Sequence, residues 1–238
     1  MSIYADHNMR SNHPPQSHIV LGGREGKDSE EQSGRFVYLI MPTHRIHEEK
    51  ETFYFTTFTC HKWFPLLEKA EIYAYLPNWI NQLSSRGLIT CGYVMMPNHL
   101  HLLVYVQKDC QGLNRVLGEG KRFMAYEIIS RLNDKNEKSI LAQLAEGVQV
   151  NERSKGKKHQ VFRLSFDAKA VVGDESINKV LDYMHHNPVS GKWNLVEDYT
   201  KYAYSSAGFY ERGEEGIVEI VDFRDVISES SGSDSERD

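Results

Sequence analysis

The central part of the chain switches repeatedly between two patterns of hydrophobic and polar positions. Apolar, aromatic and β-branched residues gather as in β-strands over 51–60, 88–96, 99–107 and 160–166. Apolar residues recur every three or four positions, as in amphipathic helices, over 68–85, 113–132, 139–144 and 175–186. Pro77 is expected to kink the first helix, and the turn at Pro97-Asn98 joins two strands. This order of elements predicts an α+β fold with a mostly antiparallel sheet.

The two ends of the chain differ from this central part in composition. Residues 1–34 show no periodicity, and residues 224–238 are acidic and rich in serine, so both ends are predicted to be disordered. Together the two ends carry the whole formal net charge of −5, which leaves a neutral domain over 35–223. A neutral domain can still present one basic face, so the overall charge does not exclude a polyanionic partner.

The cysteine pattern and the hydropathy restrict the class of protein. Cys60, Cys91 and Cys110 are an odd number and form no Cys-x-x-Cys pair, which favours free thiols over a disulfide framework or a zinc cluster. No apolar run approaches the roughly 20 residues that cross a bilayer, and no secretory leader is recognisable. A cytoplasmic protein with no membrane partner is therefore expected.

The predicted strand at 99–107 opens with two histidines that flank one leucine. Side chains alternate along a strand, so His99 and His101 are expected on one side and Leu100 in the core. Two imidazoles on one rigid strand supply half of a divalent-metal site. The alternative is a pair of surface histidines that are satisfied by solvent.

The last predicted helix carries a second candidate group. Tyr183 and Asn187 are four residues apart and therefore share one helical face. If that face meets the two imidazoles, a phenol, an amide oxygen and two ring nitrogens converge, a set that suits metal-assisted phosphoryl transfer to a tyrosine. The alternatives are a rim aromatic and an ordinary helix stop before Pro188. His185 and His186 are adjacent, so they point to different faces and cannot both join one site.

The segment Tyr93-Val94-Met95-Met96-Pro97-Asn98-His99-Leu100-His101-Leu102-Leu103 resembles the His-hydrophobic-His segment of single-tyrosine transposases. Leu181-Asp182-Tyr183-Met184-His185-His186-Asn187-Pro188 resembles the nucleophile helix of the same family, and Tyr204-Ser205-Ser206-Ala207 is similar to its closing segment. The relatives that these motifs resemble most are the REP-associated tyrosine transposases, and the resemblance spans about 52–220.

The resemblance implies a ferredoxin-like antiparallel sheet packed with helices, the fold of HUH nucleases, and a homodimer that cuts and rejoins single-stranded hairpin DNA. It implies that His99, His101 and Asn187 bind Mg²⁺ or Mn²⁺ and that Tyr183 is the nucleophile. The expected product is a 5′-phosphotyrosine link with a free 3′-hydroxyl. The resemblance leaves open whether Tyr183 acts within its own subunit, and which metal is used.

A basic stretch near 151–170 supports a nucleic-acid partner. This stretch contains six basic and two acidic residues, and Phe162 and Phe166 are suited to base stacking. With two basic positions of the preceding helix, the candidate DNA-binding residues are Lys121, Arg122, Lys155, Lys157, Lys158 and Arg163. The alternative is a solvated loop without a partner.

Two other functions remain compatible with the sequence. A domesticated protein on the same scaffold could bind hairpins or repeats without mobilising DNA. A small-molecule metallohydrolase also uses His-x-His at a strand end, but its barrel needs eight βα units, for which the chain shows no repeat.

Overall fold

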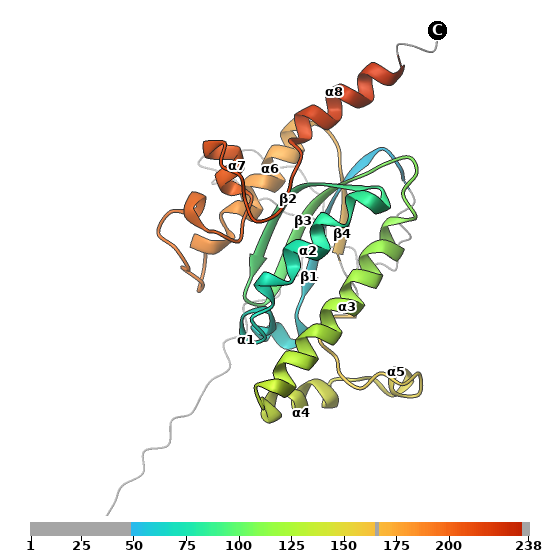
Figure 1. Ribbon diagram of the computed structural model, residues 1–238, viewed down its shortest axis with the longest axis vertical. Helices are drawn as coiled ribbons and strands as arrows, with labels where there is room; N and C mark the ends of the chain where they lie inside the picture. The colour runs from blue at the N-terminus through green and yellow to red at the C-terminus, as the bar shows by residue number, and fades with distance from the viewer. Residues whose placement is uncertain (1–48, 165–166, 235–238) are drawn as a thin grey trace, which may run out of the picture. The chain divides into compact units, whose positions relative to one another are not determined.

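The computed structural model describes residues 49–164 and 167–234; the predicted N-terminal segment 1–34 and Phe166 lie outside these ranges. Figure 1 shows a sheet wrapped by helices. The strands are β1 (Thr52–Thr59), β2 (Leu88–Met96), β3 (His99–Val106) and β4 (Asp167–Val171). The α-helices are α1 (Leu66–Lys69), α2 (Leu76–Asn81), α3 (Leu113–Asp134), α4 (Lys138–Glu146), α5 (Val150–Arg153), α6 (Asp174–His185), α7 (Ala207–Arg212) and α8 (Phe223–Asp234).

The sheet has the strand order β2-β3-β1-β4, and every neighbouring pair is antiparallel. Helices lie between β1 and β2 and between β3 and β4, which makes the βαββαβ arrangement of ferredoxin-like folds. The predicted α+β class with an antiparallel sheet is therefore confirmed. Among the described residues, no helix is both long enough and apolar enough for a bilayer crossing.

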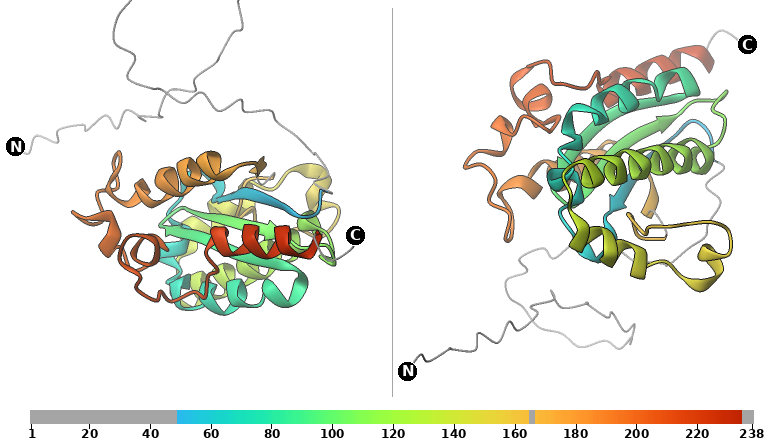
Figure 2. Two further views of the ribbon diagram at one scale, coloured as in Figure 1. Left: turned by 90° about the horizontal axis from the view of Figure 1, so that it is seen from above. Right: turned by 60° about the horizontal axis from the view of Figure 1, so that its bottom comes forward.

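Both faces of the sheet are buried. Along β3, Leu102 and Val104 belong to the core beneath α1, α2 and α3, whereas Leu103 and Tyr105 belong to a second core beneath α6 and α8. The left view of Figure 2 shows α6 and α2 on opposite sides of the strands. All residues of β3 are buried, which explains why this strand is continuously apolar except at its two histidines.

The helix predicted at 68–85 is broken into short pieces. Pro77 lies in the first turn of α2, where its missing N–H costs no hydrogen bond, so it starts a helix rather than kinking one. Glu71 adopts a left-handed backbone conformation with φ of 50°, which separates α1 from the following turn. The apolar residues keep a helical spacing across this break because both pieces pack on the same core.

The last strand lies later in the chain than predicted. Phe162 makes only an isolated bridge with Cys60, whereas β4 begins at Asp167 and pairs with β1. Val161 and Phe162 are apolar because they enter the core from a loop. β4 is a half-exposed edge strand with an Asp-Ala-Lys-Ala-Val sequence, and such a strand has little hydrophobic signal.

The acidic tail differs from the prediction of disorder at 224–234, where α8 forms. Phe223 and Val226 are buried one helical turn apart in the core beneath α6. The Asp222 carboxylate accepts a hydrogen bond from the backbone N–H of Arg224 at 2.9 Å, which satisfies one free donor of the first turn. The prediction of disorder rested on the serine-rich composition and overlooked these two apolar positions.

Two glycines of α3 provide a test of the packing between α2 and α3. A Cβ at Gly120 would overlap the indole ring of Trp79, whereas a Cβ at Gly118 meets nothing within 4 Å. Gly118→Ala should therefore stabilise the protein by about 0.5–1 kcal/mol through helix propensity. Gly120→Ala should destabilise it by about 1–3 kcal/mol through overpacking. Urea denaturation measures both changes, and equal effects of the two substitutions would contradict this packing.

Candidate functional site: an imidazole pair beneath a tyrosine helix

His99 and His101 point to the same side of β3, and their ring centroids are 4.6 Å apart. They face the core beneath α6, and they retain only 6% and 4% of their surface exposure. Interpretation as surface histidines is therefore wrong. Opposite them on β1 lie Thr59 and Thr57, which pair with His99 and His101 respectively.

Each imidazole is held through its Nδ1 atom. His101 Nδ1 lies 2.8 Å from Thr57 Oγ1, and His99 Nδ1 lies 2.7 Å from Asn98 Oδ1. His101 Nε2 is buried and has no hydrogen-bond partner among the described residues. We assign the His101 proton to Nδ1, because an N–H at Nε2 would find no acceptor. Nε2 then carries an available lone pair.

Burial keeps both rings neutral. Loss of solvent lowers the pKa of His99 to about 4, and a hydrogen bond with Asn187 partly offsets this effect. Burial also holds the pKa of His101 well below its usual value, with a smaller contribution from the neighbouring His99. At neutral pH both side chains are therefore lone-pair donors rather than cations.

Helix α6 and the turn that follows it bring Tyr183 and Asn187 to the imidazoles. The Tyr183 ring centroid is 5.8 Å from that of His101, and Phe55 stacks on His101 at 5.0 Å. Tyr183 keeps 48% of its surface exposed, so its ring borders the site at the protein surface. The Asn187 amide nitrogen donates to the Tyr183 carbonyl oxygen at 2.9 Å.

The donors around His99 fit a bound cation. A hydrogen bond with Asn187 raises the pKa of His99, so the Asn187 amide lies beside this ring. Asn98 holds the Nδ1 atom of His99, and the buried Nε2 atom of His101 has no hydrogen-bond partner among the described residues. Ring nitrogens and an amide oxygen are ligand types that a divalent cation accepts. No group of three His, Cys, Asp or Glu occurs in the described part of the chain, so Asn187 is the candidate third ligand.

The end of α6 is fixed to the edge of the sheet. His185 is buried rather than exposed, and its Nε2 lies 2.8 Å from Ser206 Oγ. The Ser206 backbone N–H donates to the Tyr93 carbonyl oxygen of β2 at 3.0 Å. The segment that resembles the family's closing segment therefore joins α6 to β2.

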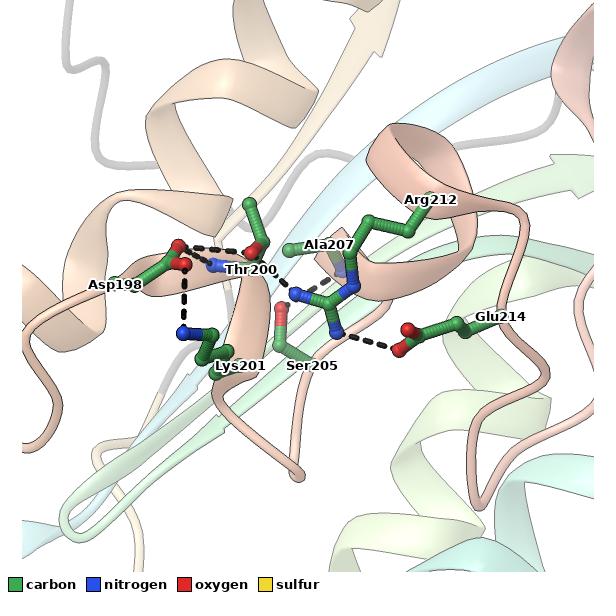
Figure 3. A network of polar contacts seen from close by, with 7 residues as sticks. All are labelled: Asp198, Thr200, Lys201, Ser205, Ala207, Arg212 and Glu214. Carbon is green, nitrogen blue, oxygen red and sulfur yellow. Dashed lines mark hydrogen bonds and ion pairs between the residues drawn. The ribbon is translucent and has the colours of Figure 1, made fainter.

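A polar network holds this closing segment in place (Figure 3). Asp198 accepts hydrogen bonds from the Thr200 backbone N–H at 3.0 Å and from its hydroxyl at 2.8 Å. Arg212 of α7 donates to Thr200 and pairs with Glu214, and the Ser205 hydroxyl accepts a hydrogen bond from the Ala207 backbone N–H at 3.1 Å. The network thereby supports the surface on which the end of α6 rests.

The candidate DNA-binding residues differ in their accessibility. Lys121 donates to the Arg163 carbonyl oxygen at 2.6 Å, and burial lowers its pKa to about 8, so this residue anchors the basic loop. Lys155 and Lys157 approach Glu152 at 3.6 and 3.7 Å. The side chains that lie exposed without an ion pair among the described residues are those of Arg122, Lys158 and Arg163. The Arg163 backbone N–H donates to the carbonyl oxygen of Thr59, the β1 residue that pairs with His99.

Sequence reasoning missed the groups that orient the imidazoles. Thr57 contacts His101 only because of the register between β1 and β3, which no local pattern reveals. Asn98 was assigned to the turn alone, although its side chain also holds His99. The position of Asn98 directly before His99 was the one available signal.

The chain is similar in fold to solved structures, one of which is described below. No family model and no curated protein matches the chain. The solved structure is described as the REP-associated tyrosine transposase bound to a REP hairpin, with 17% sequence identity and a TM-score of 0.48. The similarity covers 76% of this chain and 93% of that one.

The buried histidines predict a pH dependence of stability. The pKa of His185 is lowered to about 4, as for His99, whereas an unfolded chain has a value near 6.5. Between these values the unfolded state binds more protons. The free energy of unfolding should therefore be highest above pH 6.5. It should decrease by up to about 3 kcal/mol per histidine as the pH falls toward 4.

Urea denaturation in EDTA between pH 7 and 4.5 measures this dependence. His185→Gln should make it weaker, and His186→Gln, at a partly exposed position, is the control. If His185→Gln has the same pH dependence as the wild type, buried His185 does not contribute to it.

Proposed function

We propose that this protein nicks and rejoins single-stranded DNA at hairpins, with Tyr183 as the nucleophile. The observation that carries the proposal is the meeting of two elements. Tyr183 of α6 and Asn187, two residues after its end, lie beside the imidazoles of His99 and His101, which burial keeps neutral. Phosphoryl transfer with a covalent intermediate requires such a nucleophile beside groups that stabilise charge on a phosphate.

His99, His101 and Asn187 would hold Mg²⁺ or Mn²⁺ in this proposal. When bound, the ion supplies electrostatic stabilisation to the phosphate that reacts. Thr57 and Asn98 fix the orientation of the two rings through their Nδ1 atoms. Phe55 stacks on His101 and excludes water from one side of the ring.

The Tyr183 phenol oxygen would form a bond to the scissile phosphorus while the bond from phosphorus to the 3′-oxygen breaks. The phenol proton passes to solvent, and the leaving 3′-oxygen takes up a proton and becomes a hydroxyl. Attack by a 3′-hydroxyl on the 5′-phosphotyrosine reverses these steps and restores the tyrosine. The ester conserves the bond energy, so strand transfer needs no nucleotide cofactor.

Basic residues outside this site would bind the DNA backbone. The exposed side chains of Arg122, Lys158 and Arg163 are available for phosphate, and Lys155 and Lys157 can exchange Glu152 for it. Lys121 contributes by anchoring Arg163. The homodimer and the choice between Mg²⁺ and Mn²⁺ remain predictions of the family resemblance.

A second candidate function is hairpin or repeat binding without strand cleavage. The composition of the site favours it, because two imidazoles and one amide form a sparse ligand set without a carboxylate among the described residues. This function needs the basic surface but not Tyr183. A metallohydrolase barrel does not fit the four-stranded antiparallel sheet.

Metal binding tests the ligand set. Mn²⁺ titration followed by electron paramagnetic resonance should give one site, with affinity lowered at least about tenfold in His101→Ala. Thr57→Val should lower the affinity by about 10–100-fold, because it removes the hydrogen bond that orients His101. Thr52→Val, at the far end of β1, is the matched control. Equal affinities in Thr57→Val and Thr52→Val would exclude this role for Thr57.

Covalent attachment to DNA tests the nucleophile. In Mn²⁺ the wild-type protein should form a denaturant-resistant adduct with at least one member of a panel of hairpins with single-stranded extensions. A label at the 3′ end should travel with the protein, whereas a label at the 5′ end should leave on a shorter strand. Tyr183→Phe should abolish the adduct and keep hairpin binding, because only the hydroxyl is lost.

Tyr126→Phe is the control, since Tyr126 is an exposed tyrosine on α3. Hairpin binding without an adduct from any oligonucleotide would favour the binding protein over the nuclease. An adduct that carries the 5′ label would contradict the proposed polarity.

A further inference from the structure

An exposed tryptophan lies at the edge of the imidazole pair. Trp63 keeps 49% of its surface exposed, and its ring meets that of His99 edge to face with centroids 6.2 Å apart. Tyr183 borders the other imidazole at the surface. The two histidines therefore lie between two half-exposed aromatic side chains, one from the turn after β1 and one from α6.

The backbone presents Trp63 in an uncommon conformation. Lys62 and Trp63 have φ values of 50° and 59°, so two consecutive non-glycine residues are left-handed. Such residues cost conformational free energy and persist only where the surrounding structure imposes them. A turn whose only task was to join β1 to α1 could use glycine or asparagine here.

Asn98 fixes this turn relative to the site. Its amide nitrogen donates to the Trp63 carbonyl oxygen at 3.4 Å, while its amide oxygen contacts His99 Nδ1 at 2.7 Å. The Asn98 carbonyl oxygen also accepts from the Cys60 backbone N–H at 2.9 Å. One buried residue thus sets the distance between the tryptophan and the candidate metal ligand.

We propose that Trp63 is a stacking platform for the nucleobase next to the scissile phosphate and positions that phosphate over the imidazoles. The inference rests on the proposed function and names the part of the DNA that this edge of the site recognises. Indole is the largest aromatic face in proteins, and stacking on it tolerates every base. Stacking therefore sets where the strand lies, whereas sequence preference arises elsewhere.

A structural role for Trp63 makes a different prediction. An indole that merely shields His99 from water can be replaced by an apolar side chain, whereas a stacking platform cannot. Trp63→Leu keeps the shield and loses the aromatic face, and Trp63→Phe keeps both in reduced form. Mn²⁺ affinity reports the state of His99 in each variant, independently of DNA.

The experiment is a thermodynamic cycle in the full chain. Affinity is measured in EDTA for a hairpin oligonucleotide and for the same oligonucleotide with an abasic site next to the cleaved bond, or in turn at each unpaired position if no cleavage is found. Trp63→Leu should weaken binding of the intact strand by roughly tenfold, and Trp63→Phe by much less. The abasic site at one position should weaken wild-type binding by a similar factor and leave Trp63→Leu unchanged.

Mn²⁺ affinity should stay within about twofold of wild type in Trp63→Leu. Additive effects of the abasic site and Trp63→Leu at every position would overturn the inference, and so would an equal loss of Mn²⁺ affinity in both variants. A non-additive cycle without any covalent adduct would reject the nuclease function and support stacking of a nucleobase on Trp63. Absence of any binding to single-stranded DNA would overturn both proposals.

Discussion

Burial of two neighbouring imidazoles determines the chemistry of the candidate site. A histidine pair exposed to solvent would be partly protonated near pH 6.5 and free to rotate. On β3 the rings of His99 and His101 are buried between the sheet and α6, and burial lowers the pKa of both. Two neutral nitrogen donors in a fixed arrangement result, and the cost of burying them is met by a fold that covers both faces of one sheet.

Each further group of the site is placed by its attachment to this pair. The register between β1 and β3 puts Thr57 against His101, and the turn before β3 puts Asn98 against His99. Helix α6 covers the face of the sheet that carries the imidazoles. His185 joins the end of this helix to β2 through Ser206. Residues from three distant parts of the chain thus meet, so the geometry depends on the tertiary fold rather than on any single motif.

The sequence was sufficient for what depends on local periodicity. Alternation around Leu100 predicted that His99 and His101 share a side, and the four-residue spacing predicted that Tyr183 and Asn187 are neighbours. That the tyrosine and the imidazoles lie on the same face of the sheet was only a hypothesis, because it depends on which face α6 covers. Thr57 was invisible for the same reason, since its role arises from strand pairing. The edge strand β4 and the helix α8 were misjudged because partial burial leaves few apolar positions in the sequence.

In the proposed function, the Tyr183 phenol lies beside a metal ion that the imidazole pair would hold. Paramagnetic broadening by Mn²⁺ in protein with ¹³C-labelled tyrosine rings measures this proximity, because broadening decreases steeply with distance from the ion. The Tyr183 signal, identified by its loss in Tyr183→Phe, should broaden before that of any other tyrosine. This broadening should disappear when His99 and His101 are both replaced by alanine. A Tyr183 signal that stays sharp at saturating Mn²⁺, or that broadens equally without the two histidines, would exclude a shared site.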